Sequence, residues 1–184
     1  MACDISYGRI EACKSNVGGL RNMFIANYLP DFIENATIVS DEITAVTTPV
    51  DVFKFELRGD NNTFEEANEN SRDNGTSFWT QTANIAIKKQ DNLSQVQLKL
   101  LSYGRPHVIL EDYNGNFRVI GAQNGCEISV SSATGGAMGD MNGYNLAIEG
   151  KELSMGYFIS PAIMDDVAGF VVSAATIEDG VATP

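Results

Sequence analysis

Short runs in which apolar residues recur at every second position, separated by glycine-containing turns, limit this chain to a β-rich fold. The clearest run is 50–57, where Phe53, Phe55 and Leu57 fall on one face. Successive side chains of a strand point to opposite faces, so a period of two indicates a strand. Further strands are predicted over 20–28, 36–40, 42–46, 76–87, 107–121 around Asn114-Gly115, 126–131, 144–149, 157–161 and 167–177. The run 20–28 is apolar on both faces, so we expect it to be covered on both sides.

One convincing helix is predicted, at about residues 91–103. Leu93, Val96, Leu100 and Tyr103 recur at helical spacing and form an apolar stripe, which we expect to pack on a sheet. Asp91 or Asn92 is the expected N-cap. Gly104 stands where a left-handed residue ends a helix, and Pro106 prevents continuation. The expected fold class is therefore mainly β, a sandwich or barrel, with one flanking helix.

Length and composition predict a single domain over residues 1–184, with an N-terminal arm at about 1–19. The net charge of -12 argues against binding to nucleic-acid phosphates and to anionic membranes. The three cysteines are an odd number and form no CxxC pair, which predicts neither a disulfide framework nor a zinc site. The start of the chain does not resemble a signal peptide and no apolar run could span a membrane, so we expect folding in a cytosol.

Charge is distributed unevenly along the chain. Residues 56–73 contain six acidic and two basic residues, whereas residues 86–105 contain four basic residues and one acidic residue. The acidic part, about 58–75, is expected to project as a strand or a loop that turns at Asp73-Asn-Gly75. A head-to-tail contact between the acidic part of one copy and the basic part of the next would build rings or tubes. The candidate inter-subunit residues are Asp60, Glu65, Glu66, Glu69, Arg72, Asp73, Lys88, Lys89, Lys99 and Arg105.

No constellation of catalytic or metal-binding residues stands out. The chain has one histidine, His107, and no GxSxG motif or phosphate loop. Asp112-x-Asn114-x-Asn116 and Asp140-x-Asn142 resemble the start of a calcium loop, but both lack its later ligands and are better interpreted as turns. We therefore predict a protein that is not an enzyme and has no catalytic residue, cofactor or metal.

Four segments resemble a family of tailed-bacteriophage virion proteins, the phage tail tube (major tail) proteins. They are Ser71-Arg-Asp-Asn-Gly-Thr76, Leu100-Leu-Ser-Tyr-Gly-Arg-Pro106, Glu111-Asp-Tyr-Asn-Gly-Asn116 and Thr134-Gly-Gly-Ala-Met-Gly-Asp-Met-Asn-Gly-Tyr144. The resemblance covers about residues 1–160 and implies a β-sandwich with a flanking helix. It also implies hexameric rings that stack, with sheets lining a channel through which DNA passes without specific binding.

The resemblance further implies a place in the virion tail, after assembly in the host cytoplasm. The implied partners are other copies of the chain and other virion proteins: a tail terminator, a sheath or connector, and a baseplate. Two alternatives stay open. One is a head–tail connector ring or a capsid decoration protein. The other is a small-ligand-binding β module, which would require a deep pocket with convergent polar groups.

Overall fold

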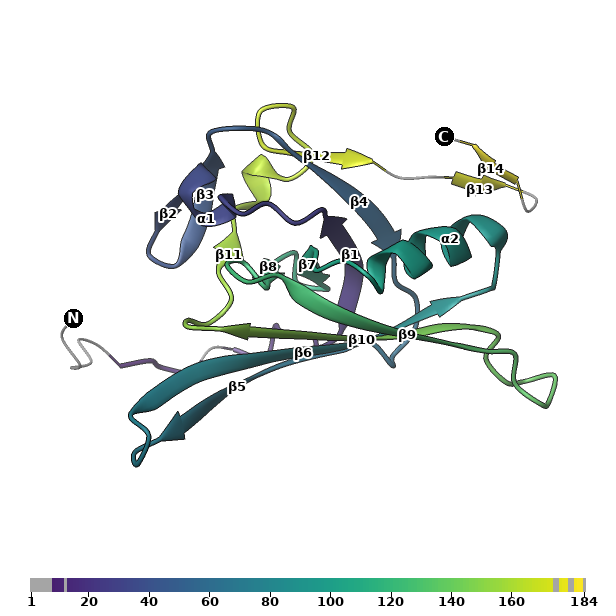
Figure 1. Cartoon of the computed structure of the whole chain (residues 1–184), viewed down its shortest axis with the longest axis horizontal. Coiled ribbons are helices and arrows are strands. Elements are labelled where there is room, and N and C mark those ends of the chain that lie inside the picture. Colours follow the sequence, from purple (N-terminus) through teal and green to yellow (C-terminus); the bar gives the residue numbers. More distant parts are fainter. Residues whose placement is uncertain (1–7, 12, 174–175, 179–180, 184) are drawn as a thin grey trace.

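The structure is a computed structural model that describes residues 8–11, 13–173, 176–178 and 181–183. The strands are β1 (Leu20–Ala26), β2 (Ala36–Val39), β3 (Glu42–Val46), β4 (Val50–Glu56), β5 (Thr63–Ser71), β6 (Thr76–Lys88), β7 (His107–Asp112), β8 (Phe117–Ile120), β9 (Cys126–Ala133), β10 (Gly143–Glu152), β11 (Phe158–Ile159), β12 (Phe170–Ser173), β13 (Thr176–Glu178) and β14 (Val181–Thr183). The helices are the one-turn α1 (Phe32–Asn35), the longer α2 (Asn92–Leu101) and the 3-10 turn η1 (Pro161–Ile163). The expected fold class, mainly β with one flanking helix, is confirmed (Figure 1).

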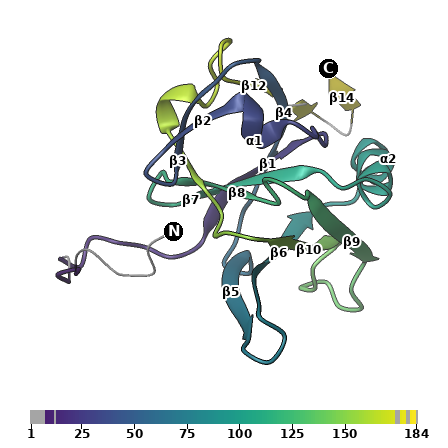
Figure 2. The same ribbon diagram turned by 60° about the vertical axis from the view of Figure 1, so that its left-hand side comes forward.

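Two sheets form the body of the molecule. The larger has the strand order β12-β4-β1-β7-β8-β11-β3-β2 and curls over the smaller, whose order is β5-β6-β10-β9 (Figures 1 and 2). Every pairing in the four-stranded sheet is antiparallel. The acidic part at about 58–75, predicted to be a strand or a loop, is largely a strand, because β5 pairs with β6 along its whole length. The short pair β13 and β14 forms a separate two-stranded sheet.

The core lies on both faces of the larger sheet. One cluster fills the space between the two sheets and includes Met23, Ile25, Leu110 and Ile148. A second cluster, with Phe24 and Ala26, fills the curl of the larger sheet on its other side. The prediction that the run 20–28 is covered on both sides is therefore confirmed for β1, which is buried except at Arg21.

The helix α2 begins as expected but presents a different face to the core. The Asp91 carboxylate accepts a hydrogen bond from the Ser94 amide at 2.8 Å, which resolves the two candidate caps in favour of Asp91. Leu98 is buried and Leu101 packs beside it, on the opposite side of the helix from the expected stripe. The prediction that the stripe packs on a sheet is wrong. Apolar residues occur on two sides of this helix, and only the side with Leu98 and Leu101 packs against the core between the sheets.

The end of α2 also differs from expectation. Gly104 does not adopt the left-handed conformation. The amides of Tyr103 and Gly104 instead donate to the carbonyls of Leu100 and Leu101, three residues earlier, at 3.2 Å each. This tighter last turn satisfies carbonyls that a left-handed glycine would otherwise cap.

The expected N-terminal arm is described for residues 8–11 and 13–19, which form no helix or strand; residues 1–7 and 12 lie outside the described residues. The base of the arm is tied to the β7–β8 turn, since the Val17 amide donates to Asn114 Oδ1 at 3.1 Å and Asn114 Nδ2 donates to the Val17 carbonyl at 2.8 Å. In the run 167–177, β12 and β13 are present, and residues 174–175 lie outside the described part.

A candidate assembly surface

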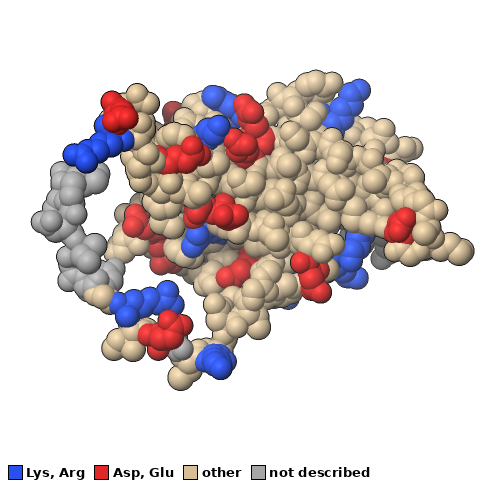
Figure 3. Space-filling view, turned by 90° about the horizontal axis from the view of Figure 1, so that it is seen from below, with Lys and Arg blue, Asp and Glu red and all other residues tan. Residues whose placement is uncertain are grey.

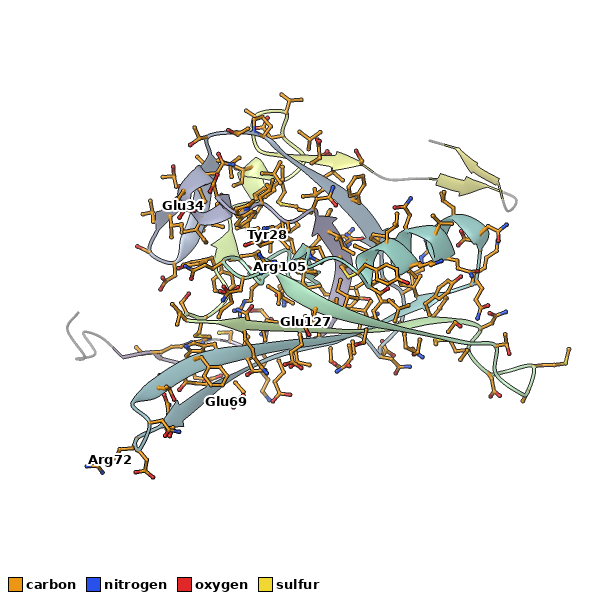
Figure 4. All side chains as sticks on the ribbon, viewed as in Figure 1. Tyr28, Glu34, Glu69, Arg72, Arg105 and Glu127 are labelled. Carbon is orange, nitrogen blue, oxygen red and sulfur yellow. The ribbon has the colours of Figure 1, made fainter. Side chains whose placement is uncertain are left out.

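The outer face of the four-stranded sheet, the side turned away from the core, is polar and carries a row of carboxylates. In the strand register, Glu149 of β10 lies between Glu127 of β9 and Thr82 of β6, and Thr82 is paired with Glu65 of β5. All three glutamates are exposed. Because paired residues of neighbouring strands point to the same side, this row crosses the full width of the sheet. Glu127, on the edge strand β9, stands at one end of this row and is labelled in Figure 4.

The rows beside these glutamates are mostly neutral. Ser129, Ala147, Asn84 and Thr63 form the next row. Figure 3 shows the molecule from this side, where charged groups are spread over a largely uncharged surface. By strand alternation the outer face carries four carboxylates (Glu65, Glu69, Glu127, Glu149) and two ammonium groups (Lys88, Lys151). The face is therefore net acidic and offers little to attract a phosphate backbone.

Hydrogen bonds hold some of these charges in place. The Lys151 ammonium lies 3.0 Å from a Glu149 carboxylate oxygen, and this hydrogen bond raises the pKa of Lys151. The Thr80 hydroxyl donates to Glu69 Oε1 at 2.6 Å across the β5–β6 pair. Both contacts orient carboxylates on a surface that has no covering element in the described chain.

Both edges of this sheet are free of further strand pairing within the described residues. The strand β5 pairs only with β6, and β9 pairs only with β10. The Cys126 amide donates to the Pro106 carbonyl at 2.8 Å instead of to β10. By alternation, the even-numbered residues of β9 then point their amides away from β10. An unpaired edge of this length is a template for pairing with another chain.

A buried polar network fastens β5 to the larger sheet. The Glu66 carboxylate accepts hydrogen bonds from Arg118 at 2.6 Å, from Gln81 Nε2 at 2.9 Å and from the Gly156 amide at 2.6 Å. Gln81 Oε1 in turn accepts from the Gly121 amide at 2.9 Å. Sequence reasoning missed Gln81 and Arg118 in this role. The sequence did hold a signal: Gln81 alternates with Ala83 and Ile85 along one strand, so its side chain points to the same apolar face. A buried amide on that face needs hydrogen-bond partners.

The predicted acidic residues spread over the length of β5. Glu65 and Glu69 are exposed on the outer face, and Arg72 and Asp73 lie exposed at the β5–β6 turn. Asp60 lies at the other end of β5, in a turn where the Lys88 side chain lies against Gly59. Glu66 differs from the others because its side chain points inward, only 3% exposed, and is bonded within the chain. We therefore leave Glu66 out of the assembly surface.

The predicted basic residues lie toward the end of the molecule that carries α2. Lys88 ends β6, Lys89 follows it, and Lys99 is on α2; all three are exposed. Arg105 is more central, with its guanidinium 4.0 Å from the centre of the Tyr28 ring (Figure 4). In the described part of the chain, Glu66 is the one candidate of the ten that makes an ion pair. The acidic turn and the basic helix end are not brought together within one copy.

His107 begins β7 and is fully buried. Its Nδ1 lies 2.6 Å from the Gly121 carbonyl, and its Nε2 accepts from the Leu29 amide at 3.0 Å. Burial lowers the pKa of this imidazole. These bonds use both ring nitrogens, so the histidine links three segments of backbone.

The calcium-like fragments form closed turns. Asp112 Oδ1 accepts the amides of Asn114 and Asn116 at 2.8 Å each, and Asp140 Oδ2 accepts the amides of Gly136 and Ala137. Among the described residues, no group of three or more His, Cys, Asp or Glu side chains is placed to hold a metal ion. The interpretation of both fragments as turns is confirmed.

A hollow of about 540 Å³ lies on the outer face of the four-stranded sheet. Its lining includes Asn61, Asn84, Ser129 and Asn145 together with Met141, and contains no titratable side chain. Such a lining offers hydrogen bonds to a neighbouring chain or a small molecule but no group for acid–base chemistry.

Comparisons with known protein families, with curated proteins and with solved structures find no match. No helix of the described chain is long and apolar enough to cross a membrane.

Proposed function

We propose that this protein is a structural subunit of a tailed-phage virion that builds the tail tube, in rings around a channel for DNA. The observation that carries the proposal is the four-stranded sheet, which combines two free edges with a polar, net acidic outer face. The resemblance of the four sequence segments to tail tube proteins supplies the virion context.

The strand directions allow the sheet to continue from copy to copy. Four strands that alternate in direction leave β5 and β9 antiparallel to each other. When β9 of one copy lies beside β5 of the next, the new pair is antiparallel, and so is every pair around a closed ring. Closure removes both exposed edges, which is the usual solution for a barrel.

The outer face suits the inside of such a ring. The carboxylate row and its neutral hydroxyl and amide neighbours would line the channel, with the core of each copy outside. Negative charge repels the phosphates of DNA, so DNA could slide without binding. Other virion proteins, such as a terminator, a sheath or connector, and a baseplate, would bind the ends or the outside of the tube.

Electron microscopy of the purified protein tests this function directly. We expect sixfold rings or stacks of rings with a central channel. A connector would instead appear as single larger rings, and a monomer at all concentrations would contradict the proposal.

Two neighbouring proline substitutions on β9 test the edge pairing. Ser132→Pro removes an amide that points away from β10, so the chain should fold with an unchanged thermal midpoint but form no rings. Ser131→Pro removes an amide that pairs with β10 and should destabilise the fold itself. Rings formed by Ser132→Pro protein would exclude pairing through this part of β9.

A further inference from the structure

The helix α2 and the turn that follows it expose a stripe of large apolar side chains that nothing in the described chain covers. The exposed fractions are 40% for Leu93, 55% for Val96, 62% for Leu100 and 80% for Tyr103. The opposite side of the helix already packs on the core through Leu98 and Leu101. A contiguous exposed apolar face of this kind indicates an interaction site.

The surroundings of this stripe are basic. Lys99 lies next to Val96 and Leu100 on the helix surface, and Lys88 and Lys89 immediately precede the helix region. The acidic residue of the same region, Asp91, is engaged in capping the helix. In a chain of net charge -12, Lys99 beside the stripe therefore favours an acidic partner at this place.

The opposite end of the molecule has the complementary character. The turn between β10 and β11 exposes Leu153 (73%) and Met155 (48%). Residues 27–49, which form α1, β2 and β3 at this end, include Asp31, Glu34, Asp41 and Glu42 and no lysine or arginine. Glu69 and the β5–β6 turn lie on the other side of the Leu153–Met155 turn (Figure 4). Apolar side chains flanked by acids thus face one way, and apolar side chains flanked by bases face the other.

These two ends cannot meet within one copy. The strand β10 runs between them, from Gly143, paired with Lys88, to Glu152, just before Leu153. Ten extended residues span about 33 Å. A contact between the ends must therefore join different copies, and it must be head-to-tail.

We propose that a second copy of this chain docks its Leu153–Met155 turn on the α2 stripe, with its acidic end facing Lys99. The contact uses neither β5 nor β9 as an edge, so it goes beyond the lateral pairing proposed above and can fail separately from it. Repetition of this heterologous contact extends copies along the direction of β10, which would stack rings.

A second copy fits this surface better than a lipid bilayer does. A basic helix with an apolar face can also lie on an anionic membrane. Here the stripe covers a helix of ten residues, and the net charge of the whole chain is strongly negative. A negative surface would attract the helix and repel the rest of the molecule.

Disulfide trapping between two proteins that each carry one introduced cysteine tests the contact. Both proteins carry Cys3→Ser and Cys13→Ser; Cys126 is buried and stays. One carries Leu100→Cys and the other Met155→Cys, with tags of different size, and they are mixed in equal amounts under mild oxidation. The matched control replaces Leu100→Cys with Gln95→Cys, which lies on the helix away from the stripe.

The expected product is the mixed Leu100→Cys and Met155→Cys dimer, formed about tenfold faster than the control dimer and faster than either homodimer. Leu100→Cys homodimers that form as fast would show a symmetric helix–helix contact and overturn the proposal. A mixed rate equal to the control rate would also overturn it. Adding Ser132→Pro should leave the mixed dimer unchanged, which separates this contact from the edge pairing.

Polar substitution of the stripe gives a second measurement. Val96→Gln with Leu100→Gln puts a good helix former at both positions, so far-UV circular dichroism should show no loss of helix. Sedimentation velocity should show association only at concentrations about tenfold or more higher than for the unmodified protein, while Gln95→Ala has no effect. Equal association of the double variant would refute the proposal. Binding of the unmodified protein to phosphatidylserine vesicles, lost in the double variant, would assign the stripe to lipid instead.

Discussion

Arg118 of the eight-stranded sheet donates a hydrogen bond of 2.6 Å to Glu66 of the four-stranded sheet. The carboxylate is 3% exposed and the guanidinium 27%, so this ion pair is shielded from water where the sheets meet. The guanidinium also lies over the Phe158 ring, 4.4 Å from its centre. The contact sets how β5, one free edge of the candidate assembly surface, is held against the body.

Removing Arg118 should therefore destabilise the fold strongly. Arg118→Met leaves the Glu66 carboxylate buried with two neutral donors, and we expect the free energy of unfolding to fall by about 3 kcal/mol. Urea unfolding measures this change. Arg58→Met is the matched control: its pair with Glu56 is exposed, at 77% and 62%, and its loss should change stability by about 0.5 kcal/mol or less.

Adjacent residues on β5 should respond oppositely to charge reversal. Glu66→Lys places a second positive charge beside Arg118 and should prevent folding, whereas Glu65→Lys, on the outer face, should leave the thermal midpoint nearly unchanged. Similar thermal midpoints for the two variants would contradict the inward orientation of Glu66.

The single histidine should make stability fall with acidity. Burial lowers the pKa of His107 below its ordinary value of 6.5, so the unfolded chain binds a proton before the folded chain does. The contribution of the neutral His107 imidazole to the free energy of unfolding is complete above about pH 6.5. It is lost as the pH falls below that value, with a slope of at most about 1.4 kcal/mol per pH unit. Unfolding of the unmodified protein and of His107→Gln, compared from about pH 7.5 to 5.5, should show this slope only in the former.

Nuclear magnetic resonance gives a direct control for this assignment, because the chain has one histidine. The imidazole should remain neutral at pH 6.5, with its proton on Nδ1 facing the Gly121 carbonyl. Half-protonation at that pH would contradict the lowered pKa.

Reversing the charge of the outer face should create DNA binding. Glu65→Lys with Glu127→Lys changes the face from four carboxylates and two ammonium groups to two carboxylates and four ammonium groups. Fluorescence anisotropy with duplex DNA should then show binding that weakens roughly a hundredfold between about 50 and 200 mM salt. Glu34→Lys with Asp41→Lys makes the same change in total charge away from this face. Equal DNA binding by that control would show that the location of the carboxylates is irrelevant.

Of the two adjacent residues Asp91 and Asn92, only Asp91 should stabilise the protein by capping α2. Asp91→Ala removes the acceptor for the Ser94 amide and should cost about 1 kcal/mol of stability. Asn92→Ala removes no cap bond and should cost less than half as much. Thermal or urea unfolding of both variants makes the comparison.

The sequence alone predicted the features that depend only on residues close together in the chain. Alternation located most of the strands, and both calcium-like fragments form turns because their carboxylates bond nearby amides. The N-cap was narrowed to Asp91 or Asn92 because a cap needs only residues three positions apart, and the structure shows that it is Asp91. The uneven charge also follows from the residues alone, and it pointed to contacts between copies.

Tertiary packing decided the features that depend on residues distant in sequence. The sequence alone places Glu65 and Glu66 side by side as two acids; the register with Gln81 and the approach of Arg118 from another sheet turn one inward and leave the other in solvent. For α2, either apolar side could have faced the core. A helix can bury only one side against a sheet. In the folded chain this is the side with Leu98 and Leu101, which packs on the core between the sheets. Leu93, Val96, Leu100 and Tyr103 therefore stay exposed.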